Sequence, residues 1–216
     1  QSLLVEEPPE FGGYDLAARS VAADEVGGDF YDFEDFGSEM LGVSIGDASG
    51  HGLPAALLVR DVVTGLRMGI EQELKVAHVF EKLNRVIHRS RLSSRFVSVF
   101  YGELEKDGNL VYVNAGHQPP ILFFREPEPG KPCEMELRIG GTVIGPLPEA
   151  HFRRGFAKVH PGEVLLMHLG MSGSFRIETG GKAGVKPVAD DAVYYKRGKL
   201  EAHDHVVFLS DEGVAY

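Results

Sequence analysis

Two aspartates stand beside glycines at the ends of short apolar segments, and they are the residues best suited to chemistry. Asp29 lies in EVGGDFYD and Asp47 lies in SIGDASGHG. If the two segments pair as a hairpin, both carboxylates face one site. Carboxylate oxygens are the ligands that Mg²⁺ and Mn²⁺ prefer, and flanking glycines let the backbone approach a metal or a phosphate. The pair therefore indicates a metal site.

Other chemistry in these stretches is less well supported. Asp47 has a structural alternative, because Asp is common in helix caps and turns near a helix start. The loop after Asp47 lacks the Gly-Lys-Ser/Thr of a P-loop, and Ser49 lacks the GxSxG pattern of a serine nucleophile. His51 and His117 are candidate ligands or acids, but an isolated His in a glycine turn is more often structural.

The elements that position these aspartates follow from the hydrophobic pattern. FYDFEDFG and SEMLGVSIGD are rich in aromatic and β-branched residues and predict the two strands of a hairpin. Apolar residues then recur every three or four positions over 53–70 and 76–90, which predicts two helices. On the second helix, the spacing places Val86 on the buried face and Asn84 on the exposed face.

The rest of the chain is rich in strand-like segments separated by turn residues. These segments are RFVSVFYGEL, NLVYVNAG, PPILFF, EMELRI, FRRGFAKV, GEVLLMHL, AVYYK and HVVFLS. Asp107-Gly108 predicts a hairpin between the first two. A strand-rich chain with two consecutive helices near its start predicts an α+β fold, in which helices cover antiparallel sheets, instead of a βαβ alternation.

Length and charge restrict the possible partners. The chain has 216 residues and a net charge of −10, which opposes binding to nucleic acid or to an anionic membrane surface. Its single cysteine, Cys133, cannot form an internal disulfide, and no apolar run is long enough to cross a bilayer. We therefore expect a cytoplasmic protein. Residues 1–15 are predicted as an arm or the end of a linker from an upstream sensor or regulatory domain, and residues 16–216 as one folded domain.

Four segments together resemble the SpoIIE/RsbU-type branch of the PP2C (PPM) metal-dependent serine/threonine phosphatases. They are VGGDFYDF, GVSIGDASGHGLPAALL, RFVSVFYGELEKDGNLVYVNAGHQPPILF and GTVIGPL, and they follow the family's order over about residues 20–168. The resemblance implies a PP2C-like sandwich of two antiparallel β-sheets flanked by α-helices.

The resemblance also implies the reaction and its residues. Two Mg²⁺ or Mn²⁺ ions activate a water that attacks the phosphorus of a phosphoserine or phosphothreonine. Asp47 bridges the two ions, Asp29 binds one of them, and the carbonyl of Ala48 completes the set, so that Asp29 and Asp47 are the catalytic residues. The implied substrate is a phosphorylated bacterial signalling protein of the STAS-domain, anti-anti-sigma type. A homodimer is left open.

The C-terminal part departs from the family pattern. In HPGEVLLMHLGMSG, Gly170 and Met171 stand where an Asp-Gly pair is expected. We assign Asp211, in HDHVVFLSDEGVAY, as its counterpart and as a further metal ligand, whereas Asp190 and Asp191 precede that motif and are not assigned. No final Asp motif follows, so either the C-terminal strand is lacking or the metal site is reduced.

The alternative function is therefore a non-catalytic binding or sensing domain, and a hydrolase of small phosphate esters is a third reading.

Overall fold

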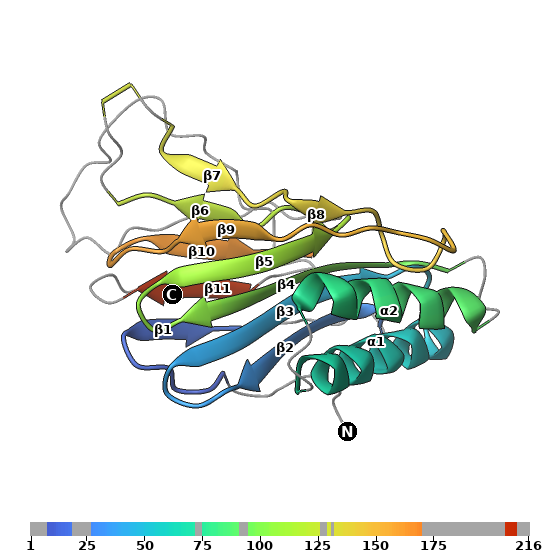
Figure 1. The fold of residues 1–216 in the computed structure, drawn as a ribbon. Coiled ribbons are helices and arrows are strands. Elements are labelled where there is room, and N and C mark those ends of the chain that lie inside the picture. The colour runs from blue at the N-terminus through green and yellow to red at the C-terminus, as the bar shows by residue number, and fades with distance from the viewer. Residues whose placement is uncertain are drawn as a thin grey trace.

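A computed structural model of the chain contains two stacked β-sheets with a pair of helices on one outer face (Figure 1). It describes residues 8–18, 27–71, 75–90, 95–125, 129–130, 132–169 and 206–210. This is the α+β arrangement predicted from the sequence. Within the described residues, no helix is both long and apolar enough to cross a membrane.

The sheet next to the helices has the order β2-β3-β4-β5-β8, and β9 also pairs with β5. Its strands are β2 (Asp29–Asp35), β3 (Met40–Ala48), β4 (Val97–Glu105), β5 (Asn109–Ala115), β8 (Gly140–Gly141) and β9 (Gly155–Lys158). Every pairing is antiparallel except that of β5 with β8, which is parallel. The predicted hairpin is confirmed, because β2 and β3 pair along their length.

The second sheet has the order β1-β11-β10-β6-β7. Its strands are β1 (Tyr14–Ala17), β6 (Ile121–Phe123), β7 (Glu134–Glu136), β10 (Val164–Met167) and β11 (Val206–Ser210). The pattern did not predict β1, which begins inside the segment expected as an arm and which follows the buried Phe11. The predicted strand AVYYK lies outside the described residues.

Helices α1 (Leu53–Glu71) and α2 (Val76–Arg89) confirm the two predicted helices and pack on the first sheet. The core between the helices and that sheet contains the helix side chains Leu58, Val62 and Phe80 with Val99 and Tyr101 of β4. A second core fills the space between the two sheets, as in other β-sandwiches. The two cores cover both faces of the central sheet.

Two residues of α2 lie opposite to their predicted positions. Val86 is 62% exposed, whereas Asn84 is fully buried. The Asn84 side chain accepts a hydrogen bond from the backbone N–H of Gly145 at 2.9 Å and donates one to the carbonyl of Leu147, also at 2.9 Å. A buried amide is stable when its hydrogen bonds are satisfied. Asn84 therefore anchors the loop after β8 to the helix pair.

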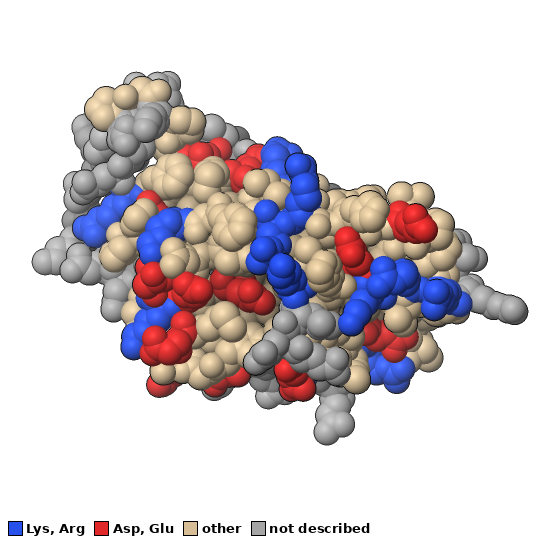
Figure 2. All heavy atoms as spheres, in the orientation of Figure 1, with Lys and Arg blue, Asp and Glu red and all other residues tan. Residues whose placement is uncertain are grey.

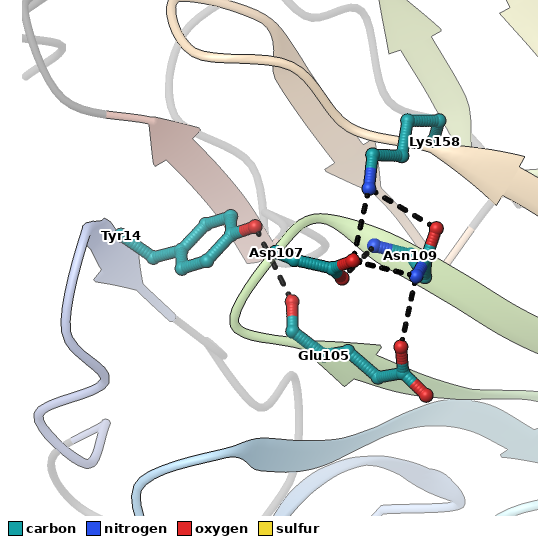
Figure 3. Close-up of polar contacts among 5 residues, drawn as sticks. All are labelled: Tyr14, Glu105, Asp107, Asn109 and Lys158. Atoms are coloured by element: carbon teal, nitrogen blue, oxygen red, sulfur yellow. Dashed lines mark hydrogen bonds and ion pairs between the residues drawn. The ribbon is translucent and has the colours of Figure 1, made fainter.

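The predicted Asp107-Gly108 turn joins β4 to β5, and Gly108 has a φ of 92° that favours glycine. Figure 3 shows the side chains around it. Asn109 donates hydrogen bonds to Asp107 at 2.8 Å and to Glu105 at 2.9 Å, while Lys158 of β9 lies 3.3 Å from the Asp107 carboxylate. On the face shown in Figure 2, acidic and basic side chains are interspersed over sheets and helices.

Candidate metal centre

The hairpin of β2 and β3 brings Asp29 and Asp47 directly opposite each other. The N–H of Ala48 donates to the carbonyl of Gly28 at 2.9 Å, so the Gly28–Ala48 pair belongs to the hydrogen-bonded set of this ladder. Hydrogen-bonded and non-hydrogen-bonded pairs alternate in antiparallel sheets, which makes Asp29–Asp47 a non-hydrogen-bonded pair. Side chains are closest in such pairs, with Cβ atoms about 4.5–5.5 Å apart.

Both carboxylates lie on the face of the sheet that looks toward the second sheet. Side chains alternate along a strand, and Tyr31 of β2 and Ile45 of β3 belong to the core between the sheets. Asp29 and Asp47 are two residues away from these and therefore share their face. Both aspartates are half-buried. Their pairing places two carboxyl groups side by side at the edge of the sandwich.

Gly28 allows the close approach of the two strands beside this pair. A Cβ atom at Gly28 would lie 2.4 Å from the carbonyl oxygen of Ala48, which real Cβ contacts do not allow. The glycine that precedes Asp29 in the sequence is therefore required by packing. The backbone of Ala48, whose carbonyl was predicted as a metal ligand, lies immediately beside the carboxylate pair.

The loop after β3 is held to the start of β4 by reciprocal contacts. Ser49 donates its N–H to the carbonyl of Phe96 and accepts the N–H of Phe96 on its hydroxyl oxygen, both at 2.8 Å. The Ser49 hydroxyl thus has a structural role, in agreement with its exclusion as a nucleophile. Arg95 donates from Nη1 to the carbonyl of Ser49 at 3.2 Å. A guanidinium therefore lies against the loop next to Asp47, which the sequence reasoning missed.

Helix α1 begins directly after this loop, and its N-cap position is Gly52. The carbonyl of Gly52 accepts the N–H groups of Ala55 at 3.1 Å and Ala56 at 3.2 Å, and Gly52 has a φ of 69°. Asp47 lies in β3 and is not the N-cap residue of α1. His51, a weaker candidate, is exposed in the same loop.

His117 lies in the turn after β5 and is almost completely buried, with 5% exposure. Its Nδ1 lies 2.9 Å from the hydroxyl of Ser98, and Ser98 is the cross-strand partner of Asp47. Its Nε2 lies 3.0 Å from the carbonyl oxygen of His168, which follows β10. Burial lowers the pKa of His117 to about 4, against the smaller opposing effect of the hydrogen bond to His168.

Two other acids of β2, Asp32 and Glu34, belong to a separate cluster on the helix face. Asp32 is buried and accepts two hydrogen bonds from Arg67 of α1, at 2.8 and 2.6 Å. Glu34 lies nearby, and the hydroxyl of Tyr101 is 3.5 Å from its carboxylate. Burial, followed by the charge of Asp32, raises the pKa of Glu34 to about 7. This cluster fixes α1 to the sheet and is distinct from the Asp29–Asp47 pair.

The donor set at Asp29 and Asp47 fits a hard divalent cation. The two opposed carboxyl groups offer oxygen ligands from neighbouring strands to one cation. Mg²⁺ and Mn²⁺ keep several waters and need only a few protein oxygens. Among the residues that the structure describes, no three His, Cys, Asp or Glu side chains form a group that could hold a metal ion. A third carboxylate would have to come from elsewhere in the chain.

The predicted third ligand, Asp211, lies outside the described residues. The residue before it, Ser210, is the last residue of β11 and pairs with Tyr14 of β1. Its neighbour Leu209 pairs with Val164, the first residue of β10. His168 follows the last residue of β10, at the opposite end of that strand. The role of Asp211 stays a prediction.

The comparison with protein families agrees with this architecture. Residues 37–168 match the model of the family described as Stage II sporulation protein E (SpoIIE). The chain belongs to the SpoIIE family. The match ends two residues before Gly170 and Met171, where the sequence departs from the expected pattern. A solved structure of SpoIIE from Bacillus subtilis is described as a PP2C phosphatase domain and has the fold of this chain, so the predicted family and fold class are confirmed.

Individual relatives add detail. The phosphoserine phosphatase RsbU of Bacillus subtilis is 26% identical over 168 residues, which cover 77% of this chain and 49% of RsbU. The chain therefore spans about half the length of this relative. The formamidopyrimidine-DNA glycosylase of Rhizobium meliloti is 57% identical over 53 residues, which cover 24% of this chain and 18% of that enzyme. A match over so short a part of the glycosylase does not extend the activity of that enzyme to this chain.

Two solved structures show the same fold. The RsbU and RsbW domains of Rv1364c from Mycobacterium tuberculosis superpose with a TM-score of 0.62 and 26% identity, over 73% of this chain and 44% of that chain. RsbX in complex with magnesium superposes with a TM-score of 0.56 and 14% identity, over 73% of each chain. The second likeness concerns the fold alone.

Proposed function

We propose that this domain is a metal-dependent protein serine/threonine phosphatase that acts on a phosphorylated bacterial signalling protein. The observation that carries the proposal is the opposed pair of Asp29 and Asp47, in a chain of the SpoIIE family. RsbU, a relative over three quarters of this chain, is named a phosphoserine phosphatase. A substrate of the STAS-domain, anti-anti-sigma type, an upstream regulatory domain and a cytoplasmic location belong to the same proposal.

The aspartates would hold the metal ions, and the sequence offers a third ligand. Asp29 and Asp47 bind from neighbouring strands, the carbonyl of Ala48 adds a neutral oxygen, and Asp211 is the proposed further ligand. When bound, two Mg²⁺ or Mn²⁺ ions activate a water and neutralise charge on the phosphoryl group. This chemistry requires no protein nucleophile, which agrees with the occupied hydroxyl of Ser49.

Arg95 is proposed to bind the phosphoryl group of the substrate. Its guanidinium lies against the loop that follows Asp47, and a Cβ atom at Gly50 would be 2.6 Å from Nη1. One N–H donates to the carbonyl of Ser49. Arg has five N–H donors, so others are left to contact phosphoryl oxygens, for which the guanidinium is well suited. The loop contact fixes the orientation of the side chain before substrate binds.

The test is Mn²⁺-dependent release of phosphate from a phosphoserine protein, compared between the natural chain and Asp47→Asn. Loss of the Asp47 carboxylate should lower the rate on the order of 100-fold or more. Asp61→Asn is the matched control, because Asp61 is exposed on α1 and contacts Arg60, next to it in the sequence. Equal rates for Asp47→Asn and the natural chain would refute the proposed mechanism. Substrate profiling with small phosphate esters separates a protein phosphatase from a general phosphate-ester hydrolase.

A non-catalytic binding domain is the second candidate, and the sequence supplies the observation that favours it. Gly170 and Met171 stand where the family pattern has an Asp-Gly pair, which would remove one metal ligand from this position. Calorimetry decides between the candidates, because a binding domain should not take up Mn²⁺ at millimolar concentration.

A further inference from the structure

His117 connects the two sheets at the edge where the aspartates lie. It is buried in the turn that follows β5, and the amide N–H of His117 donates to the side chain of Asn114 at 2.8 Å. One ring nitrogen meets Ser98 of β4 in the first sheet, and the other meets the carbonyl of His168, directly after β10 in the second sheet. A single imidazole thus spans the gap between the sheets.

The positions of the protons in this bridge follow from its acceptors. The carbonyl oxygen of His168 can only accept, so Nε2 of His117 carries the hydrogen. With burial keeping the ring neutral, Nδ1 has no hydrogen and accepts one from the hydroxyl of Ser98 at 2.9 Å. The carbonyl of Asp47 is also 3.4 Å from the Ser98 oxygen, but the hydroxyl has one hydrogen and the shorter contact takes it.

The bridge reaches the metal-binding edge through Ser98. Ser98 pairs with Asp47 in the ladder of β3 and β4, and its side chain lies against the Asp47 carbonyl. In the second sheet, His168 lies two residues before Gly170, the position at which the family pattern has an aspartate. His117 therefore joins the strand that carries Asp47 to the end of β10, where this chain has Gly170 in place of the family's aspartate.

We propose that His117 and Ser98 form a positioning bridge that fixes the backbone of Asp47 relative to the end of β10, and thereby sets the affinity of the metal centre. This inference rests on the proposed function, since it concerns the same centre. Ser98 and His117 also form a Ser–His pair, but the imidazole donates its hydrogen to a carbonyl and lacks an orienting carboxylate in this contact. A role for Ser98 as a nucleophile is therefore an alternative outcome of the test.

Four single substitutions and one double variant test the two ends of the bridge. His117→Asn keeps an acceptor near the position of Nδ1 and loses the hydrogen bond to His168. His117→Gln keeps a donor near the position of Nε2 and loses the acceptor for Ser98. Ser98→Ala removes the hydroxyl, and Ser98→Thr restores it. The double variant Ser98→Ala/His117→Gln tests whether the two residues act as one unit.

The main readout is the dissociation constant for Mn²⁺, measured by calorimetry on protein whose fold is verified by NMR in the absence of metal. Loss of a residue that orients a metal ligand typically weakens binding 10–100-fold. We therefore expect Ser98→Ala, His117→Asn and His117→Gln each to raise the Kd by about tenfold or more, and Ser98→Thr to return it to the natural value. The double variant should bind no more weakly than His117→Gln.

A second readout is independent of metal. The ¹⁵N chemical shifts of His117 should show hydrogen on Nε2 and none on Nδ1, unchanged from pH 5.5 to 8. Hydrogen on Nδ1 would overturn the bridge. Folded variants with the natural Kd would also overturn it, even if the natural chain releases phosphate, and a complete loss of turnover in Ser98→Ala at unchanged Kd would favour a nucleophilic Ser98. If the natural chain binds Mn²⁺ without releasing phosphate, the proposed activity fails while the bridge is still tested by the Kd values.

Discussion

Glu34 should make the domain less stable as the pH rises toward neutrality. Its carboxyl lies on the helix face of β2, near the Asp32–Arg67 pair and the hydroxyl of Tyr101. Burial is the first cause of its raised pKa, the charge of Asp32 is the second, and Arg67 opposes both. Replacement by Gln preserves the size of the side chain and removes the ionisation.

The sign and size of the effect follow from linkage. The pKa of this carboxyl is 4.5 as the ordinary value and about 7 in the folded chain. Between these values the folded state binds the proton and the unfolded state has lost it. The stability that the protonated Glu34 carboxyl contributes is therefore fully present below pH 4.5 and is lost as the pH rises through 7. For a fully buried group, this shift of the pKa would lower the free energy of unfolding by about 3 kcal/mol. Because Glu34 is partly exposed, solvent screening reduces our expectation to about 1–2 kcal/mol.

The assay is urea unfolding of the natural chain, Glu34→Gln and Glu39→Gln at pH 4.5, 6 and 8. Glu39 is the matched control, because its side chain is 79% exposed. We expect Glu34→Gln to equal the natural chain at pH 4.5 and to exceed its free energy of unfolding by about 1–2 kcal/mol at pH 8. At pH 8, Glu39→Gln should change the free energy of unfolding much less than Glu34→Gln does. A Glu34→Gln variant that is equally or less stable than the natural chain at pH 8 would refute the reasoning.

Three further predictions test the fold and the site. Asn84→Ala should lower the free energy of unfolding by about 2 kcal/mol in urea denaturation, because it leaves buried backbone groups of the 145–147 loop without their partner; an unchanged value would contradict the anchoring role. Gly28→Ala should weaken Mn²⁺ binding about tenfold or more in calorimetry, whereas Gly12→Ala, with open space around its Cβ, should not. Arg95→Ala should raise the KM for a phosphoserine protein about tenfold or more at saturating Mn²⁺, and the KM of Arg95→Lys should lie between that of the natural chain and that of Arg95→Ala. An unchanged KM in Arg95→Ala would show that Arg95 does not contact the substrate.

Local patterns were sufficient to predict much of the fold. Both helices and the two hairpins have their signal within a short stretch. The helices show a period of three to four residues, the β4–β5 hairpin has the Asp107-Gly108 turn, and the β2–β3 hairpin consists of two neighbouring segments rich in aromatic and β-branched residues. The errors on α2 have a different origin. Asn84 has the composition of an exposed residue, and its partners in the loop after β8 are about sixty residues away in sequence. Tertiary hydrogen bonds of this kind leave no mark on helical periodicity.

In the candidate site, too, contacts between neighbouring strands could be predicted, whereas contacts between distant parts of the chain could not. Asp29 and Asp47 could be placed together because they lie in one hairpin, so that the register of two neighbouring strands decides their contact. The contact of His117 with His168 joins residues 51 positions apart that belong to different sheets. The sequence offered only NAGHQPP as a signal, which is equally consistent with an ordinary turn. Burial and both partners became visible only when the sheets were stacked.

Strand β2 shows how one short segment serves two kinds of chemistry. DFYDFED contains four acids within seven residues, and alternation along the strand sends them to opposite faces. Asp32 is neutralised by Arg67 and fixes α1 to the sheet, whereas Asp29 shares the other face with Asp47. A shift of one residue in the register would exchange these environments and place Asp32 at the metal-binding face. The core side chains Phe30 and Tyr31 on alternate faces resist such a shift, so the packing of the two cores determines which carboxylate is available to a cation.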